Sequence, residues 1–154
     1  MKNIIVLRIR PGEPPERIQT ENSFEGLCAA IGAERLECTM PFDDSVTVIS
    51  SERKMCSSLP MNRALVHDSM VYDVIKGTFL IAGDDTGAGF TSLSFDMSEK
   101  YRKRFLAPEI FTIENGRFFM CRTHGDTTEN IPFADPEWFR STYLGKEPEC
   151  QNYS

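Results

Sequence analysis

Two short segments of this chain carry polar side chains whose types could support chemistry. The loop GDDTGAG, residues 83–89, places Asp84 and Asp85 directly after a run of β-branched and aromatic residues. The pair Asn62-Arg63 places an amide and a guanidinium fork between apolar residues. From these segments, with the loop extended to residue 91, we select the candidate residues for binding a ligand or partner: Asn62, Arg63, Asp84, Asp85 and Thr91.

The glycine-rich loop has three interpretations: a phosphate cradle, an acidic metal site and a turn. It lacks the Lys-Ser/Thr pair of a P-loop, and its glycines do not follow the G-x-G-x-x-G spacing. Two carboxylates at its mouth would also repel a phosphate unless a cation intervened. Adjacent aspartates beside glycines are most often solvated turn residues, so we expect no metal, no cofactor and a flexible connection from a strand to a helix. The glycines would let the backbone approach a ligand or partner closely.

Arg63 has a structural and a functional interpretation. In the structural interpretation Arg63 is a clamp: its guanidinium would form an ion pair with Asp68 or Asp73 in a partly buried place. As a ligand residue, it would join Arg8 and Arg10, at the end of the first strand, in a site for a small anion. We favour the clamp, and the anion site stays open as the alternative.

Cysteine and histidine side chains give no complete catalytic or metal-binding set. The spacing Cys121-x-x-His124 suits two metal ligands, but a structural zinc site needs four, and the sequence has no second such pair. His67 or His124 could serve as general base for one of the five cysteines, which keeps a small thiol enzyme as an alternative. The cysteines are odd in number and have no C-x-x-C spacing, so we expect free thiols. We assign no catalytic residue.

Hydrophobic periodicity predicts the elements that must hold these side chains. Alternating apolar residues predict strands, and apolar residues at i, i+3, i+4 and i+7 predict helices. Asn22 with Glu25, and Asp96 with Glu99, are the predicted capping boxes. The predicted strands cover residues 3–10, 16–20, 35–40, 45–50 and 71–83, the last a long central strand interrupted at Gly77, and the predicted helices cover residues 23–31 and 95–106.

The remaining segments complete the predicted fold. Residues 59–66, which contain Asn62 and Arg63, are predicted to be irregular. Residues 109–123 are predicted to form a β-hairpin, because Asn115-Gly116 accepts the positive φ values of a type I′ turn. The order of elements predicts an α+β fold with a mostly antiparallel sheet, two helices and an added C-terminal β-hairpin. We expect residues 1–107 to form the main part, and the hairpin and tail, residues 108–154, to pack on the same single domain.

Composition and charge limit the class of protein. With 40% hydrophobic and 26% charged residues, the chain has the composition of a packed globular protein. The 17 basic residues against 23 acidic ones give a net charge of −6, which disfavours broad contact with a nucleic-acid backbone. The basic run from Lys100 to Arg104 is typical of a solvated helix face, although it could dock an acidic partner. The N-terminal apolar run is too short to cross a membrane, so we expect a cytoplasmic protein.

Three stretches of the sequence resemble a known family. They are Pro60-x-Asn62-Arg63-Ala64-Leu65, Gly77-Thr78-Phe79-Leu80-Ile81-x-Gly83, and Phe90-x-Ser92-Leu93 before the second helix. Over roughly residues 3–106, the chain resembles a bacterial and phage domain family of unknown function, common on plasmids, prophages and integrative elements of Gram-positive bacteria. The resemblance implies an accessory protein of a mobile genetic element, and it transfers no catalytic residue.

These observations predict a non-catalytic protein that acts by binding. Its partner would be a host or mobile-element protein, or a small anionic ligand, in a counter-defence or regulatory role. One alternative is a small cytosolic enzyme that uses Cys or Asp chemistry near the 83–91 loop. Another is a structural or regulatory subunit that forms a homodimer through the aromatic hairpin, with Phe111, Phe118 and Phe119.

Overall fold

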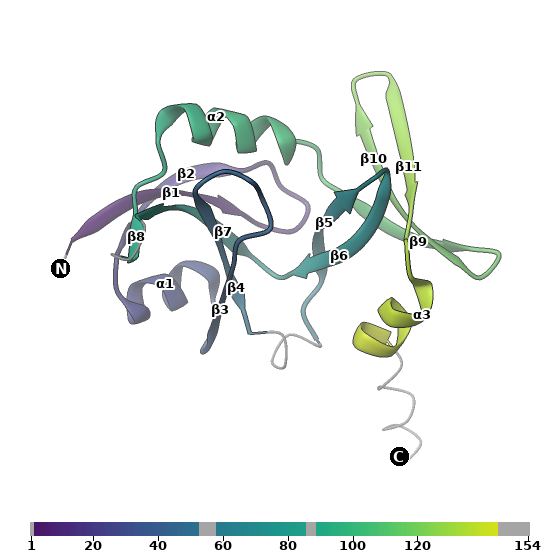
Figure 1. The fold of residues 1–154 in the computed structure, drawn as a ribbon, viewed down its shortest axis with the longest axis horizontal. Helices are drawn as coiled ribbons and strands as arrows, with labels where there is room; N and C mark the ends of the chain where they lie inside the picture. The colour runs from purple at the N-terminus through teal and green to yellow at the C-terminus, as the bar shows by residue number, and fades with distance from the viewer. Residues whose placement is uncertain (1, 53–57, 86–88, 145–154) are drawn as a thin grey trace, which may run out of the picture. The chain divides into compact units, whose positions relative to one another are not determined.

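The computed structural model describes residues 2–52, 58–85 and 89–144 (Figure 1). Within these ranges it contains antiparallel sheets, three helices and a C-terminal antiparallel sheet. The predicted α+β fold is therefore confirmed. Among the described residues, no helix combines the length and the apolar character needed to cross a membrane.

The chain forms two compact units, and each unit draws on two segments of the sequence. The first unit comprises Met1–Arg63 and Ile75–Pro108. The second unit comprises Ala64–Val74 and Glu109–Ser154. The sequence also places a boundary at residues 107 and 108, but the second unit additionally takes up eleven residues from the middle of the chain, 64–74.

The first unit is built on an antiparallel sheet with the strand order β2-β1-β7-β4-β3, and β8 pairs with β7. β7 is central in this order, as the apolar run before the glycine-rich loop predicts. α1 and α2 lie on opposite sides of the sheet (Figure 1). The elements are β1 (Asn3–Ile9), β2 (Glu16–Glu21), α1 (Phe24–Ile31), β3 (Leu36–Thr39), β4 (Val46–Ser51), β7 (Phe79–Asp85), β8 (Gly89–Thr91) and α2 (Phe95–Arg104).

Both faces of this sheet are buried, because successive side chains of a strand point to opposite faces and each face has a helix. On one face, Ile4 of β1 packs in a cluster with Leu27 of α1. On the other face, Phe79 at the start of β7 meets Phe105, just after α2, with 5.8 Å between the ring centroids. The last residue of β1, Ile9, is fully buried.

Serine residues cap both helices, which corrects the predicted caps. The Ser23 hydroxyl accepts a backbone hydrogen bond of 3.0 Å in α1, and the Ser94 hydroxyl accepts one of 3.2 Å in α2. Asn22 instead donates its amide to the carbonyl oxygen of Phe90 at 3.0 Å, and Asp96 lies inside the first turn of α2. A helix cap is the residue directly before the first turn, and its backbone is extended. A hydroxyl at this position accepts a hydrogen bond from a backbone N–H of the first turn that has no carbonyl partner within the helix.

The segment around Asn62 is a strand, which corrects the prediction of an irregular segment. β5 (Met61–His67) pairs with β6 (Met70–Lys76) in a hairpin. Asp68 and Ser69 form the turn with φ values of 52° and 64°, in the left-handed region that a two-residue hairpin turn requires. The Asp-Ser pair is a weaker turn signal than Asn-Gly, and the polar residues in β5 interrupt the apolar alternation.

Gly77 separates β6 from β7, so the predicted long strand is two strands that belong to different sheets. Its φ is 75°, and its N–H donates to the carbonyl oxygen of Pro60 at 2.8 Å. A Cβ at this position would lie 2.8 Å from Cδ1 of Leu59, so a larger residue would be both strained and crowded. The glycine therefore turns the chain from the β5–β6 hairpin into the central strand.

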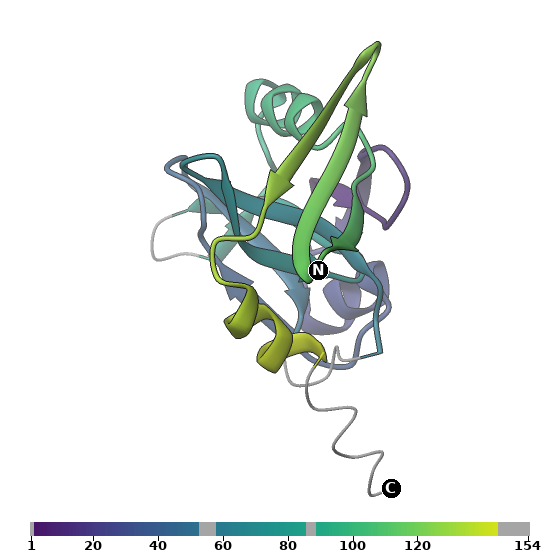
Figure 2. The ribbon, with the colours of Figure 1, turned by 90° about the vertical axis from the view of Figure 1, so that its right-hand side faces the viewer.

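The second unit contains the predicted C-terminal hairpin and a further strand. β10 pairs with both β9 and β11 (Figure 2). Asn115 and Gly116 form the predicted turn between β9 and β10, with φ values of 53° and 79°. The rings of Phe118, Phe133 and Phe139 pack with centroids 4.5 to 5.9 Å apart. The elements are β9 (Ile110–Glu114), β10 (Arg117–His124), β11 (Thr127–Pro132), α3 (Pro136–Phe139) and η2 (Arg140–Leu144).

Candidate functional site

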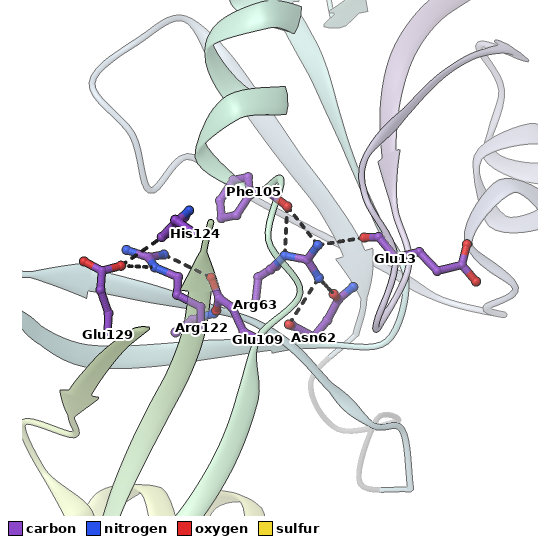
Figure 3. A network of polar contacts seen from close by, with 9 residues as sticks. Glu13, Asn62, Arg63, Phe105, Glu109, Arg122, His124 and Glu129 are labelled. Carbon is purple, nitrogen blue, oxygen red and sulfur yellow. Dashed lines mark hydrogen bonds and ion pairs between the residues drawn. The ribbon is translucent and has the colours of Figure 1, made fainter. Parts of the chain in front are cut away.

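Arg63 is fully buried and bonded to oxygen atoms of three other residues. Its Nε and Nη2 donate to the carbonyl oxygen of Phe105 at 3.2 and 2.8 Å, and Nη2 also donates to the carbonyl oxygen of Glu13 at 2.7 Å. Its Nη1 donates to Oδ1 of Asn62 at 2.7 Å. Figure 3 shows the guanidinium between these oxygens. Arg63 therefore joins β5 to the end of α2 and to the loop between β1 and β2.

The carbonyl group of Phe105 is an electrostatic partner for Arg63. Phe105 caps the C-terminus of α2, where the helix dipole places partial negative charge. Acceptors around a buried guanidinium lower the free energy that its burial costs. The sequence predicts that Arg63 is a clamp bound to Asp68 or Asp73. The hydrogen bonds to Phe105, Glu13 and Asn62 give Arg63 the role of a clamp through carbonyl and amide oxygens. Asp68 is 88% exposed, and Asp73 accepts from the backbone amide of the residue that follows it.

Asn62 is also fully buried, and it connects the end of β1 with the turn at Gly77. Its Nδ2 donates to the carbonyl oxygens of Ile9 and Gly77 at 2.9 and 2.8 Å, and its Oδ1 accepts from Arg63. Both amide donors and the acceptor are therefore used inside the protein. With no exposed surface, Asn62 and Arg63 act as scaffold residues in this structure.

The glycine-rich loop is part of a β-hairpin between β7 and β8, which corrects the predicted connection from a strand to a helix. Residues 86–88 and the side chain of Asp85 lie outside the described part of the structure. The register of the hairpin pairs Gly83 with Thr91, Asp84 with Phe90, and Asp85 with Gly89.

Gly83 is needed because the chain packs against itself there. A Cβ at Gly83 would lie 2.6 Å from the carbonyl oxygen of Ser92 and 2.7 Å from Oγ1 of Thr91. Only a residue without a side chain allows backbone to come this close. At Gly83 the close approach is made to Thr91 and Ser92 of the same chain.

Two segments that carry aspartates meet at one end of the first sheet. The backbone N–H of Asp84 donates to the carbonyl oxygen of Ser45 at 3.2 Å. This contact brings the β7–β8 hairpin next to the loop between β3 and β4. That loop contains Asp43, which is exposed, whereas Asp84 is half-buried. We call Asp43, Asp44 and Asp84 the acidic end.

Asp44 is bound by two side chains of α2. Its Oδ2 accepts from Nζ of Lys100 and from the hydroxyl of Tyr101, both at 2.6 Å. The bond from Lys100, followed by the bond from Tyr101, lowers the pKa of Asp44 below its usual value. Burial and the bond to Asp44 raise the pKa of Tyr101. Both shifts favour the charged carboxylate and the neutral phenol that the hydrogen bond requires.

The structure separates the candidate residues into two groups. Asn62 contacts Gly77, just before β7, whereas Asp84 and Thr91 lie at the other end of β7. At about 3.3 Å per residue, the strand between these points spans about 20 Å. The five candidate residues therefore do not form one site.

Arg8 and Arg10 converge on a carboxylate of their own chain. Oε2 of Glu16 lies 3.0 Å from Nε of Arg8 and 2.9 Å from Nη2 of Arg10. Arg8 and Glu16 are direct cross-strand neighbours in β1 and β2, which favours an ion pair. Glu16 therefore takes the place that the anion of the alternative interpretation would occupy.

The second unit holds a charged network that the sequence does not predict. The fully buried carboxylate of Glu109 accepts from the backbone N–H of Ala64 at 2.6 Å and from Nη1 of Arg122 at 3.2 Å (Figure 3). Arg122 also binds Glu129 through Nε at 2.6 Å, and Nε2 of His124 lies 3.3 Å from the same carboxylate. The bond from Arg122 lowers the pKa of Glu129. Arg122 and Glu129 are cross-strand partners in β10 and β11, a register that the sequence analysis does not predict.

Cys121 and His124 do not share a metal site. They are three residues apart on β10, and side chains with odd spacing on a strand point to opposite faces. Sγ of Cys121 instead donates to Oδ1 of Asn130 at 2.6 Å. Within the ranges that the structure describes, no group of three His, Cys, Asp or Glu residues could hold a metal ion.

The predicted free thiols are confirmed for three cysteines, Cys28, Cys38 and Cys121. Cys38 is exposed as a residue, but its thiol is partly covered, and this partial burial, followed by the nearby charge of Glu37, raises the pKa of the thiol. A raised pKa lowers the fraction of nucleophilic thiolate at neutral pH. Cys56 and Cys150 lie outside the described residues.

Comparison with known proteins gives a match to one family model. The model, described as a domain of unknown function (DUF3846), matches residues 1–106. Neither curated proteins nor solved structures gave a significant match to the chain.

Proposed function

The chain belongs to the DUF3846 family, and on this premise we propose that it is a non-catalytic accessory protein of a bacterial mobile genetic element. In this proposal it binds a protein of the host or of the element. The function of the family is unknown, so the proposal rests on the candidate site. The likeness of the Pro60–Leu65 and Gly77–Gly83 stretches to proteins of phages and plasmids supports the mobile-element origin.

The observation that carries the proposal is the complete burial of Asn62 and Arg63. A catalytic group must touch its substrate. The side chains of Asn62 and Arg63 instead donate hydrogen bonds to carbonyl oxygens inside the protein. Their role in holding β1, β5 and α2 together supports a rigid scaffold. A rigid scaffold that presents loops at its ends is a common arrangement for recognition.

The acidic end is the surface that fits a protein partner best. Asp43 and Asp84 come from two segments that a backbone hydrogen bond holds together, so these segments lie side by side before a partner arrives. Carboxylates repel a small anionic ligand and attract lysine and arginine side chains. The acidic end therefore favours a basic protein surface over the small anion that the sequence also allowed.

The proposal is tested by capture of proteins from a lysate of a Gram-positive host with three tagged baits. The baits are the wild type, the double variant Asp43→Lys/Asp84→Lys, and the control Asp126→Lys, which changes an exposed aspartate in the β10–β11 turn. We expect a basic protein that the wild type and the control retain and the double variant loses. Its retention should also weaken as the salt concentration rises. The same retained proteins on all three baits would contradict the proposal.

A further inference from the structure

β2 is an edge strand of the first sheet, and its register shows which of its backbone groups point outward. Among the described residues, β2 pairs with β1 and with no other strand. The backbone N–H of Asn22 donates to the carbonyl oxygen of Lys2 at 2.8 Å, and this pair continues the register of β1 and β2. Hydrogen-bonded and non-hydrogen-bonded pairs alternate along an antiparallel ladder. The even-numbered residues of β2 therefore bond to β1, whereas Arg17, Gln19 and Glu21 direct their backbone groups away from it.

The contacts of β1 support this assignment. Gln19 lies opposite Ile5 in the register. The N–H of Ile5 donates to Oγ of Ser92 at 2.9 Å, and its carbonyl oxygen accepts from the N–H of Leu93 at 2.8 Å. Both backbone groups of Ile5 thus point away from β2, as they do in a non-hydrogen-bonded pair. The backbone groups of Gln19 must then point to the other side, out of the sheet.

The open part of this edge is short and well defined. Arg17 and Gln19 are exposed, and within the described ranges their backbone groups make no hydrogen bond outside the sheet. At one end of the strand, Pro15 has no N–H to offer. At the other end, the carbonyl oxygen of Glu21 accepts from the N–H of Ser23 at 2.9 Å. Unpaired donors and acceptors on an edge strand are a template for a further strand.

The three outward residues carry their side chains on one face of the sheet. Successive side chains of a strand alternate between faces. Ile18 packs against the cluster that contains Leu27 of α1, so its neighbours in β2 face the α2 side. The guanidinium carbon of Arg17 accordingly lies 5.9 Å from the ring centroid of Phe95 in α2. The edge therefore presents a base, an amide and an acid in one exposed row: Arg17, Gln19 and Glu21.

We propose that β2 pairs antiparallel with β2 of a second copy of the chain, about a two-fold axis that passes between the two Gln19 residues. A two-fold interface requires a surface that is complementary to itself. The row of base, amide and acid meets this condition, because Arg17 of each copy then lies opposite Glu21 of the other. The same axis makes the two Gln19 residues a hydrogen-bonded pair, since their backbone N–H and C=O groups face each other.

The charges also select this register over its neighbours. Outward backbone groups recur at every second residue, so the strands could slide by two residues and still form hydrogen bonds. A slide by two residues places Gln19 opposite Arg17 in one direction and opposite Glu21 in the other. Both ion pairs are lost in either case. The row therefore favours the register that is centred on Gln19.

Exposed phenylalanines lie near this edge and would add apolar contact. Phe95, beside Arg17, is 64% exposed, and Phe24, which begins α1 soon after β2 ends, is 57% exposed. The main-chain hydrogen bonds are the principal attraction when one strand is added to another. β2 has six residues, so the paired length is about 20 Å. Because short contacts of this kind are weak, we expect a dissociation constant on the order of 100 µM.

The test uses charge reversals that fail alone and succeed together. In Arg17→Glu two acids face each other across the axis, and in Glu21→Arg two bases do. Each variant alone should therefore dimerise at least about tenfold more weakly than the wild type. In an equimolar mixture, one copy supplies all the acids and the other all the bases, so both ion pairs return. Sedimentation velocity from about 20 to about 500 µM should show a dimer in the mixture.

The matched control is Arg35→Glu, which makes the same charge change. Arg35 is exposed and lies directly before β3, at the other edge of the sheet. We expect this variant to dimerise as the wild type does. Circular dichroism would show that every variant is folded.

Amide hydrogen exchange provides a readout of the backbone itself. The N–H of Gln19 points out of the sheet in the monomer, so its exchange should slow as the protein concentration rises. The N–H groups of Ile18 and Thr20 bond to β1 and should be protected at every concentration. This contrast between neighbouring amides distinguishes strand pairing from contact through a face of the sheet.

Three results would overturn the proposal. They are a wild type that stays monomeric up to about 500 µM, a mixture that dimerises no better than its two components, and a dimer in which the Gln19 amide still exchanges freely. The last result would place the contact elsewhere, such as the aromatic hairpin that the sequence suggests. β2 shares no residue with the acidic end, so none of these results bears on the proposed partner binding there.

Discussion

At the scale of the residue, Arg63 connects three parts of the first unit through one guanidinium. Arg63→Ala removes the donors to the carbonyl oxygens of Phe105 and Glu13 and leaves a cavity in the core. Removal of a buried charged side chain together with its hydrogen bonds typically lowers the free energy of unfolding by about 3 to 5 kcal/mol. We expect a loss of this size in the free energy of unfolding, measured by urea denaturation at pH 7.

Arg17→Ala is the matched control, because Arg17 is exposed and its guanidinium lies 5.9 Å from the ring centroid of Phe95. Its loss should change stability by less than about 0.5 kcal/mol. Arg63→Lys keeps the charge but loses the planar fork, so it should fall between the two. An unchanged denaturation midpoint in Arg63→Ala, with a stabilisation by phosphate or nucleotide seen only in the wild type, would show that Arg63 binds a ligand.

The sequence shows that Arg63 needs a partner, but it does not show which one. The acceptors on Glu13 and Phe105 lie 50 and 42 positions away in the chain. They are also main-chain carbonyl groups, which every residue carries. A prediction from side-chain types selects the nearest aspartates, whereas the fold determines which carbonyl oxygens reach the guanidinium.

At the scale of the element, the loop between β3 and β4 contacts α2 through Phe42 and Asp44. The Phe42 ring lies 4.8 Å from the Tyr101 ring, and the guanidinium carbon of Arg104 lies 4.5 Å from the Phe42 centroid. Asp44 adds its hydrogen bonds to Lys100 and Tyr101. Lys100, Lys103 and Arg104 are exposed, so the basic run of α2 is a solvated face, as the sequence predicts, although Lys100 and Arg104 also make these contacts.

This attachment should make the stability of the protein depend on acid pH. The pKa of Asp44 is lowered in the folded state, so between the folded and unfolded pKa values the unfolded chain binds more protons. The contribution of Asp44 is therefore complete above the ordinary aspartate pKa of about 3.9 and is lost as the pH falls through the lowered value. We expect the melting temperature of the wild type to fall more steeply below about pH 4 than that of Asp44→Asn.

Thermal melts by circular dichroism between about pH 7 and about pH 2 would measure this difference. Asp126→Asn removes the same charge from an exposed turn and serves as the control. The prediction fails if the wild type and Asp44→Asn lose stability in parallel over the acid range.

Local patterns predict most elements, and long-range contacts explain the misses. The α1 and α2 stripes, the β3–β4 hairpin and the Asn115-Gly116 turn follow from spacing and turn chemistry within a few residues. β5 was missed because its polar pair, Asn62 and Arg63, is satisfied only by carbonyl groups from β1, α2 and the turn at Gly77. A polar pair in a buried strand therefore looks irregular until its remote acceptors are known.

At the scale of the whole molecule, the family region and the C-terminal segment are not separable at residue 107. Residues 64–74 lie inside the matched family region, yet they form one compact unit with the C-terminal segment. Val71 is 1% exposed and forms a bridge with Phe133, and its carbonyl oxygen accepts from the N–H of Ala134 at 2.8 Å. The backbone N–H of Ala64 is likewise bound by Glu109.

A fragment of residues 1–107 should therefore lose the partners of residues 64–74. We expect amide hydrogens in this segment to exchange much faster in the fragment than in the full chain, because local stability follows local packing. The fragment should also bind a hydrophobic dye through the exposed Val71 surface. The control is a chain of residues 1–144, in which the exchange of residues 64–74 should match that of the full chain. Equal protection in the 1–107 fragment would show that residues 64–74 are held without the C-terminal segment.

The interleaving of the two units also sets the order in which a ribosome can complete them. The first unit is complete once residue 108 has emerged, whereas residues 64–74 must wait for Phe133. At roughly 5 to 20 residues per second, the roughly 25 residues between residue 108 and Phe133 take about 1 to 5 s to synthesise. During this interval Val71 of the β5–β6 hairpin lacks its bridge to Phe133. A newly made chain is therefore most exposed to aggregation, proteolysis or capture by a chaperone at a defined stage of its own synthesis, after the first unit has closed.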